Sequence, residues 1–235
     1  MININTVASS SLGNCYILDD GEDKLLIECG ISIKKIKQAM NFKLTDTVGC
    51  LVSHSHFDHS KDIKKILSAG INVYTSKGTS EELKVSDYNL HHIESGKQFK
   101  IRGWTILPFE TFHNTKEPLG FLITNKNNEK LLFATDTYYL KYKFKGLNII
   151  MIECNHSYKI LDENVAAGRL HPAQKKRLIQ SHMALENVKD MLKANDLSRV
   201  KEIYLIHLSD GNSSAKEFKR EIQEISGKPT YIAGE

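Results

Sequence analysis

Short apolar runs alternate with polar turns along the chain, and two different spacings within these runs predict strands and helices. Runs rich in β-branched and aromatic residues, bounded by turn-forming residues, predict strands. The predicted strands are residues 2–8, 14–18, 24–28, 48–53, 72–75, 105–110, 119–124, 130–134, 148–153, 202–206 and 229–232. Stretches with an apolar residue at every third or fourth position predict helices. The predicted helices are residues 33–40, 58–68, 80–84, 172–179, 184–194 and 215–226.

The order of these elements predicts an α/β (α+β) protein that is built in layers. The start and the middle of the chain are rich in strands, and the last third is mainly helical with two strands between the helices. This order is typical of two sheets that carry helices on their outer faces. No repeat, low-complexity tract or Pro/Gly linker divides the sequence. We therefore expect a single domain over residues 1–235.

Composition places the chain among ordinary soluble proteins, with 40% hydrophobic and 26% charged residues. No run approaches the ~20 apolar residues of a membrane helix. The N-terminus lacks the basic start and apolar run of a signal peptide. The four cysteines, Cys15, Cys29, Cys50 and Cys154, form no C-x-x-C pair. We therefore expect a reduced, cytoplasmic protein without a membrane segment, in which Cys29 and Cys50 are small core residues.

The charge balance permits nucleic acid as a partner without requiring it, since the net charge is +4 and the pI is about 8.7. Basic clusters on predicted helices are most simply explained as solvated helix faces. Lys141, Lys143 and Lys145 differ, because they alternate with Tyr142 and Phe144. A basic and aromatic strand edge of this kind is a better candidate for nucleic-acid binding.

One loop concentrates candidate metal ligands. His54-x-His56-x-Asp58-His59 directly follows the predicted strand 48–53 and offers four potential ligands within six residues. Imidazole and carboxylate groups are ligands that suit zinc, manganese or iron. Four crowded ionisable groups also cost desolvation and repulsion unless a cation compensates them. The loop therefore predicts a metal site, and the alternative is a polar loop with a structural role.

Three further candidates stand at the ends of later predicted strands. His113 follows strand 105–110, Asp136 follows strand 130–134, and His207 follows strand 202–206. Taken singly, each histidine could be a surface or core residue, and the aspartate could cap backbone amides. Their equivalent positions make the joint pattern stronger, because a two-metal hydrolytic centre needs ligands from several elements, including a carboxylate that bridges the metals.

In this order, the motifs resemble those of the metallo-β-lactamase fold superfamily over essentially the whole chain. The resemblance implies a four-layer αββα sandwich and a centre with two divalent metal ions, zinc or manganese, with iron as a further candidate. It also implies that Asp58 serves both as a ligand and as a catalytic group that orients an attacking hydroxide. The implied ligands are His54, His56 and His113 for one metal, Asp58, His59 and His207 for the other, and Asp136 as the bridge.

A second resemblance points to the YycJ/WalJ-type subgroup, whose members are regarded as 5′-to-3′ exonucleases that act on double-stranded DNA. It rests on residues 8–14, 25–32, 117–121, 153–156 and 181–185. The chain departs from this group at Glu28, where the family usually has Asp. His156 and His182 carry no metal role in this pattern. Each could bind a phosphate oxygen or protonate a leaving group, and the alternative is a surface histidine.

The sequence thus favours a metal-dependent phosphodiesterase, most simply a nuclease that uses a metal-activated hydroxide and acts on DNA. A small-molecule hydrolase of the same fold, cleaving a thioester, a lactone or a cyclic nucleotide, is the alternative. A metal-binding protein without catalysis is the third possibility. A nuclease needs a basic track for phosphates, whereas a small-molecule hydrolase needs an enclosed apolar pocket. The residues leave the oligomeric state and the polarity of cleavage open.

Overall fold

The computed structural model describes residues 1–235, which form two compact units. The N-terminal unit comprises residues 1–110, 115–129 and 234. The C-terminal unit comprises residues 111–114, 130–233 and 235. That the chain makes one domain over residues 1–235 stays a prediction. No helix in either unit has the length and the apolar character needed to cross a membrane.

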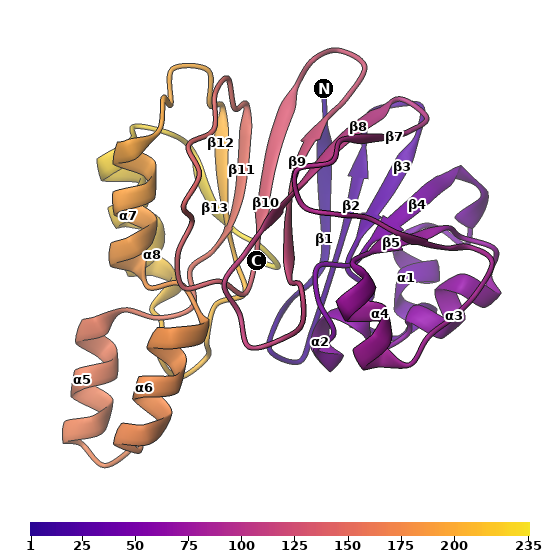
Figure 1. The fold of residues 1–235 in the computed structure, drawn as a ribbon. Helices are drawn as coiled ribbons and strands as arrows, with labels where there is room; N and C mark the ends of the chain where they lie inside the picture. Colours follow the sequence, from indigo (N-terminus) through magenta and orange to yellow (C-terminus); the bar gives the residue numbers. More distant parts are fainter. The chain divides into compact units, whose positions relative to one another are not determined.

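The N-terminal unit contains a six-stranded sheet in the order β1-β2-β3-β4-β5-β6, and Figure 1 labels β1 to β5 of it. Its first three strands are antiparallel, and β3 to β6 run parallel. Three further strands of this unit, β7, β8 and β9, form an antiparallel ladder. The strands are β1 (Asn3–Ser10), β2 (Gly13–Asp19), β3 (Lys24–Ile27), β4 (Thr47–Leu51), β5 (Val73–Thr75), β6 (Leu90–His92), β7 (Phe99–Ile101), β8 (Trp104–Glu110) and β9 (Leu119–Thr124).

A hydrophobic core joins this sheet to its helices. Residues two apart on a strand point to the same face, and Cys15 and Ile17 of β2 both belong to this core. They are packed there with Ile36 of α1 and Ile66 of α3. All four cysteines are free and buried, which confirms that Cys29 and Cys50 are core residues. The helical elements are α1 (Ile33–Ala39), the 3₁₀ turn η1 (Leu44–Asp46), α2 (Phe57–Ser60), α3 (Ile63–Ser68) and α4 (Lys77–Leu83).

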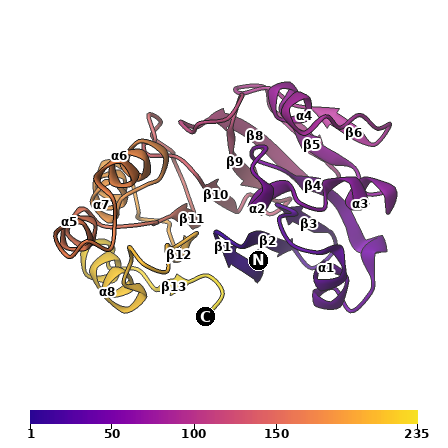
Figure 2. The same cartoon turned by 90° about the horizontal axis from the view of Figure 1, so that it is seen from below.

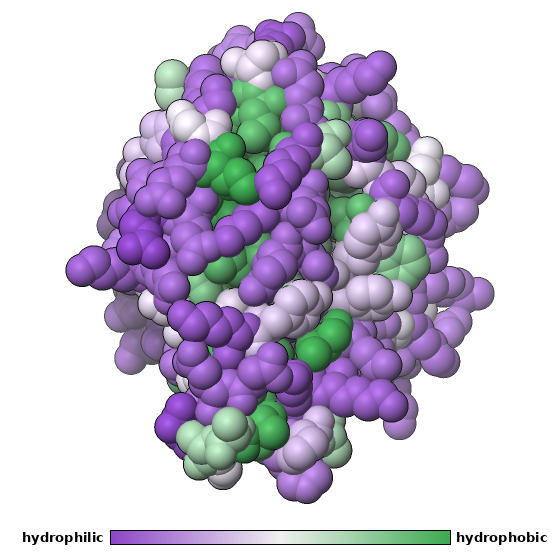
Figure 3. Space-filling view, turned by 90° about the vertical axis from the view of Figure 1, so that its left-hand side faces the viewer, coloured by the Kyte–Doolittle hydropathy of each residue, from purple (hydrophilic) through white to green (hydrophobic).

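In the C-terminal unit, four parallel strands lie beside four helices (Figure 2). Helix α7 buries Val188, and α8 buries Phe218 and Ile222. Lys189 of α7 forms an ion pair with Glu221 of α8. The helical face of this unit is mainly hydrophilic, with scattered hydrophobic patches (Figure 3). The elements are β10 (Lys130–Ala134), β11 (Ile149–Glu153), β12 (Glu202–Ile206), β13 (Thr230–Ile232), α5 (Tyr158–Ala166), α6 (Pro172–Ser181), α7 (Leu185–Ala194) and α8 (Ala215–Ser226).

Most predicted elements are present with shifts of a few residues at their ends, and the exceptions have identifiable causes. The predicted helix 58–68 is two helices, because the Asp62 backbone N–H bonds to the Cys29 carbonyl and the Asp62 carboxylate accepts the Ile33 N–H at 2.6 Å. The predicted strand edge around residues 141–145 is irregular chain instead. Helix α5, which starts after the capping residue Ser157, and strand β7 were absent from the predicted elements.

A close approach of two backbones fixes the start of α2. A Cβ atom on Gly30 would lie 1.6 Å from the backbone oxygen of Asp58, so only glycine fits at this position. The Cys29 N–H also donates to the His59 carbonyl at 2.9 Å. The residues after β3 and the segment that carries Asp58 and His59 are thereby held together.

We expect Gly30→Ala to lower the free energy of unfolding by roughly 2–4 kcal/mol, because a backbone segment must move to admit the methyl group. Gly211→Ala is the matched control, since nothing lies within 4 Å of its Cβ position. Urea unfolding of both variants checks the prediction. Equal free energies of unfolding for the two variants would show that the Asp58 segment moves aside without loss of stability.

Candidate metal centre

The N-terminal unit gathers the four residues of the predicted loop. The chain leaves β4, passes His54 and His56, and enters α2 with Asp58 and His59 in its first turn. The His54 ring centroid lies 4.9 Å from that of His56 and 4.2 Å from that of His59. An Asp58 carboxylate oxygen lies 3.3 Å from His59 Nε2. The structure therefore brings all four together within one short segment.

Glu28 lies behind this group of residues and is fully buried. Its Oε2 lies 3.7 Å from His59 Nδ1, and its carboxylate accepts the Ser53 N–H at 3.3 Å. Burial raises the pKa of Glu28, and the hydrogen bond and charge of His59 oppose this shift. Glu28 thus faces the Nδ1 side of the ring, the side on which carboxylates lie behind many metal-bound histidines. The Glu that departs from the family pattern therefore still lies next to His59.

Asn14 contributes its side chain to this group of residues. Its Nδ2 donates to the Asp58 carbonyl at 3.2 Å and lies 3.2 Å from His59 Nε2. An amide nitrogen can only donate, so this contact favours an unprotonated Nε2 and a ring proton on Nδ1, the side of Glu28.

In the C-terminal unit, Asp136 lies at the centre of a second cluster. His113 Nε2 is 3.4 Å from Asp136 Oδ2, and His207 Nε2 is 3.8 Å from Asp136 Oδ1. Asp136 and His207 follow β10 and β12 and have left-handed backbones, with φ of 43° and 53°. Glu28 has the same conformation, at 64°. Such backbones cost about 1–3 kcal/mol each and are concentrated at functional sites.

Glu153 is the residue of this cluster to which the sequence assigned no role. It ends β11, is fully buried, and accepts the N–H groups of Thr137 and Met183 at 3.1 Å each. Its other oxygen lies 2.6 Å from His182 Nδ1 and 3.3 Å from His207 Nδ1. Potential ligand atoms of Asp136, Glu153, His182 and His207 lie within 4.8 Å of one another. Both carboxylate oxygens of Glu153 are engaged in these contacts, so this residue orients His182 and His207.

His182 follows α6, and its ring is partly exposed, at 18%. Burial alone would lower its pKa, but the charge of Glu153 and the hydrogen bond to it outweigh burial and raise the pKa. A raised pKa favours a protonated ring near neutral pH. The alternative of an unpartnered surface histidine does not hold for His182, since it contacts a buried carboxylate.

His156 belongs to none of the groups of residues whose potential ligand atoms lie within 4.8 Å of one another. The alternative of a surface histidine is wrong for it as well, because its exposure is 0% and neither ring nitrogen has a hydrogen-bond partner. Burial lowers its pKa to about 4. The ring is therefore neutral at neutral pH. The expectation that His156 is catalytic stays a prediction.

The donor pattern fits divalent metal ions. His113 Nδ1 lies 2.8 Å from the Ser181 carbonyl, which can only accept, so its Nε2 lone pair is directed at the Asp136 carboxylate. Burial lowers the pKa of His113, which keeps the ring neutral. His59 Nε2 meets Asp58 in the same way. Two acceptors 3.3–3.4 Å apart repel each other unless a cation lies between them.

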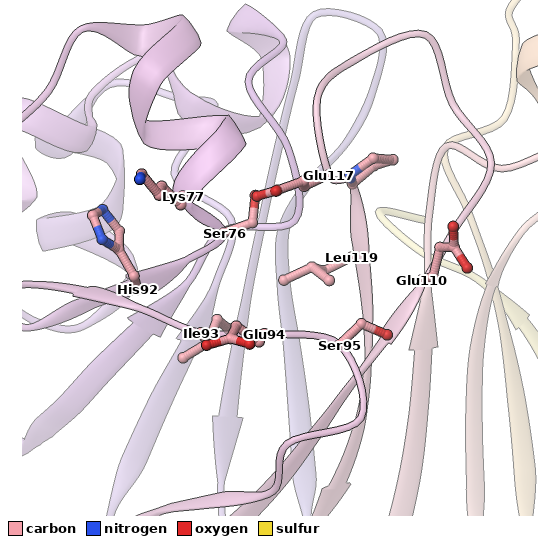
Figure 4. A pocket seen from close by; sticks show the side chains of 10 residues that line it. Ser76, Lys77, His92, Ile93, Glu94, Ser95, Glu110, Glu117 and Leu119 are labelled. Atoms are coloured by element: carbon pink, nitrogen blue, oxygen red, sulfur yellow. The ribbon is translucent and has the colours of Figure 1, made fainter.

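A cavity of about 610 Å³ in the N-terminal unit contains none of the predicted site residues (Figure 4). Glu94, Glu110 and Glu117 line it, together with Lys77 and His92. Glu117 also accepts the Gly78 N–H at 2.7 Å. Three carboxylates disfavour a phosphate ligand, and the wall is not the apolar enclosure expected of a small-molecule hydrolase.

The parallel strands and the His/Asp clusters at their ends define the class as that of a metal-binding hydrolase fold. A family model described as the beta-lactamase superfamily domain matches residues 23–208, and the chain belongs to this superfamily. Exodeoxyribonuclease YycJ of Bacillus anthracis is 26% identical over 253 residues, covering 100% of this chain and 92% of the relative. Exodeoxyribonuclease WalJ of Streptococcus pneumoniae serotype 2 is 29% identical, covering 88% of this chain and 81% of the relative.

Among solved structures, the metallo-β-lactamase fold protein YhfI from Bacillus subtilis is similar over 99% of this chain and 97% of its own. The TM-score is 0.73 at 15% identity. The expected fold class, a four-layer αββα metallo-β-lactamase sandwich, is confirmed by these comparisons. Membership of the superfamily and the His/Asp clusters support a hydrolase able to bind metal ions.

The depressed pKa of His156 predicts acid sensitivity. The folded protein binds this proton at a pKa of about 4 and the unfolded chain near 6.5, so the unfolded state holds more protons between these values. Stability is lost as the pH falls through this window. We expect wild type in EDTA to lose about 2 kcal/mol more than His156→Gln between pH 7 and pH 5.

Urea unfolding at both pH values measures the difference. His91→Gln is the control, because His91 is exposed and bonds only to Asn72 at its Nε2. Equal pH dependence in wild type and His156→Gln would contradict a neutral buried ring.

Proposed function

We propose that the protein is a metal-dependent phosphodiesterase that hydrolyses DNA and removes nucleotides as an exonuclease. Two divalent ions, zinc or manganese with iron as a further candidate, would be held by histidine and aspartate ligands. The chemistry of the donors supports this assignment, since ligand atoms of Asp136, His182 and His207 converge within 4.8 Å and Asp58 lies 3.3 Å from His59 Nε2. The ligands are His54, His56 and His113 for one ion, Asp58, His59 and His207 for the second, and Asp136 between them.

The ions, when bound, would activate a water molecule and offset the negative charge of a phosphodiester in its transition state. The residues of the chain supply orientation and proton transfer. Asp58 accepts a hydrogen bond from the attacking water and thereby aims its lone pair. Asn14 fixes the Asp58 carbonyl at 3.2 Å, and Glu28 lies at His59 Nδ1, so this half of the site is held in place before substrate binds.

The observation that carries the proposal is the position of His182. Its Nδ1 lies 2.6 Å from a carboxylate oxygen of Glu153 and 3.7 Å from a carboxylate oxygen of Asp136. A protonated imidazole beside the cluster can give its proton to the departing sugar oxygen. An alkoxide is a poor leaving group and needs that proton. A thiolate, with a thiol pKa near 8.5, departs with little help. A cationic general acid therefore favours an oxygen ester, such as a phosphodiester, over a thioester.

The first prediction from this proposal concerns the ligands. Asp136→Asn should lower hydrolysis of bis(p-nitrophenyl) phosphate and of end-labelled duplex DNA by roughly 1,000-fold, because it weakens metal binding and removes the bridging charge. Metal analysis of the purified variant should show less bound metal than in wild type. His91→Ala serves as the control. Unchanged metal content and turnover in Asp136→Asn would contradict the ligand assignment, and turnover of a thioester alone would reject the nuclease.

A second prediction concerns His182. Its protonated form is the active one, so activity should fall as the pH rises through its raised pKa. His182→Gln should lower kcat on DNA by roughly 100-fold and abolish this alkaline fall. Glu153→Gln removes the charge that raises the pKa, so the fall should begin at a lower pH.

The pH–rate profiles of wild type and both variants check this. An alkaline limb that persists unchanged in His182→Gln would show that another group supplies the proton. A substrate with a p-nitrophenolate leaving group is the internal comparison, because it needs a general acid less and should be affected less by His182→Gln.

A further inference from the structure

An exposed aromatic and basic surface lies beside the cluster of the C-terminal unit, on the chain between β10 and β11. We define it as the stacking surface, formed by Phe112 and residues 138–145. Tyr138 and Tyr139 are 39% and 54% exposed. The Phe112 ring lies 5.7 Å from the Tyr138 ring and 6.4 Å from the Tyr139 ring, centroid to centroid. Three aromatic rings thus lie together, two of them open to solvent.

This surface is held in place although it is neither strand nor helix. Leu140 and Phe144 are buried and anchor the segment. The Tyr138 carbonyl accepts an N–H of the Asn187 side chain at 3.0 Å, and the Tyr139 carbonyl accepts the Thr137 hydroxyl at 2.8 Å. The exposed rings are therefore ordered before any ligand arrives, which reduces the entropy lost on binding.

Its charge is one-sided. Lys141, Lys143 and Lys145 are exposed, and no acidic residue occurs between residues 137 and 147. Lys141 Nζ lies 5.5 Å from the Phe112 ring centroid and 5.1 Å from that of Tyr142. A groove of about 250 Å³ beneath the segment has one acidic residue in its wall, Asp190. The surface thus offers flat rings and positive charge together.

The surface is joined directly to the proposed reaction centre. Phe112 precedes His113 in the chain, and Tyr138 follows Asp136 by two residues. Thr137 connects the two, because its N–H donates to Glu153 at 3.1 Å and its hydroxyl accepts the Phe112 N–H at 2.9 Å. A nucleotide lying on Tyr138 would have its phosphate close to Asp136.

Flat rings with neighbouring lysines match one ligand chemistry, the unpaired bases of a nucleic-acid strand with its phosphates. Bases within a duplex stack on one another and cannot offer their faces to a protein ring. We propose that Tyr138 and Tyr139 stack the unpaired bases at a DNA end, so that the preferred substrate of the site is a duplex with a single-stranded overhang. This inference rests on the proposed nuclease function and narrows its substrate.

The test measures binding without catalysis. Fluorescence anisotropy in EDTA compares three labelled DNAs: a blunt duplex, the same duplex with a short single-stranded overhang, and that overhang with abasic sites. We expect Tyr138→Ala/Tyr139→Ala to bind the overhang DNA ~10-fold or more weakly and to bind the blunt duplex like wild type. The abasic overhang should weaken wild type by a similar factor and the double variant no further.

Two variants control for folding. Tyr138→Phe/Tyr139→Phe keeps both rings and should bind like wild type. Tyr88→Ala removes the most exposed tyrosine, 96% exposed and outside the surface, and should change nothing. Equal overhang binding by wild type and the double alanine variant would overturn the inference. The inference would also be overturned if the abasic overhang weakened DNA binding by wild type and by the double alanine variant to the same extent. Binding of an acidic peptide in preference to DNA would overturn it too.

Failure of the inference and failure of the proposed function give different results. Hydrolysis of bis(p-nitrophenyl) phosphate and DNA by wild type reports on the nuclease alone. If wild type cleaves DNA but the double alanine variant binds the overhang as well as wild type does, only the stacking surface is rejected. Absence of any phosphodiester hydrolysis with overhang binding intact rejects the nuclease and leaves the binding surface.

Discussion

Two fully buried carboxylates govern the candidate site. Glu28 lies at Nδ1 of His59, and Glu153 lies at Nδ1 of both His182 and His207. With the Nδ1 proton on the glutamate side, Nε2 is the nitrogen that remains to bind a ligand. For His59 and His207 the atoms opposite Nε2 are aspartate oxygens. Acceptor atoms directed at acceptor atoms require a cation, so the arrangement depends on these glutamates.

The same carboxylate separates the roles of two histidines. Glu153 holds His182 at 2.6 Å and raises its pKa, which favours the protonated ring. His156, three residues along the chain from Glu153, is buried without a hydrogen-bond partner, and its pKa falls to about 4. The pKa values of these two histidines are therefore shifted in opposite directions, and the cause is the charge of Glu153 and the hydrogen bond that His182 makes to it.

Local pattern explains which elements were predictable. Strands β9, β10 and β12 and helix α8 occur at their predicted bounds, because periodic apolar residues and turn signals decide them locally. The predicted helix 58–68 fails because Asp62 bonds to Ile33, a residue 29 positions away. The segment 141–145 alternates like a strand, but Phe144 donates its N–H to the side chain of Asn195 instead of a neighbouring strand.

The sequence by itself determined the kinds of ligand and their places after strands, since His54 to His59, His113, Asp136 and His207 are visible in order. Only the tertiary structure decided which nitrogen of each histidine is available and which ring is protonated. His113 is oriented by Ser181, 68 residues away, and the only signals for Glu153 in the sequence were its position at the end of a strand and its place in segment 153–156. The reason is physical, because tautomer and pKa depend on burial and on partners that only folding brings close.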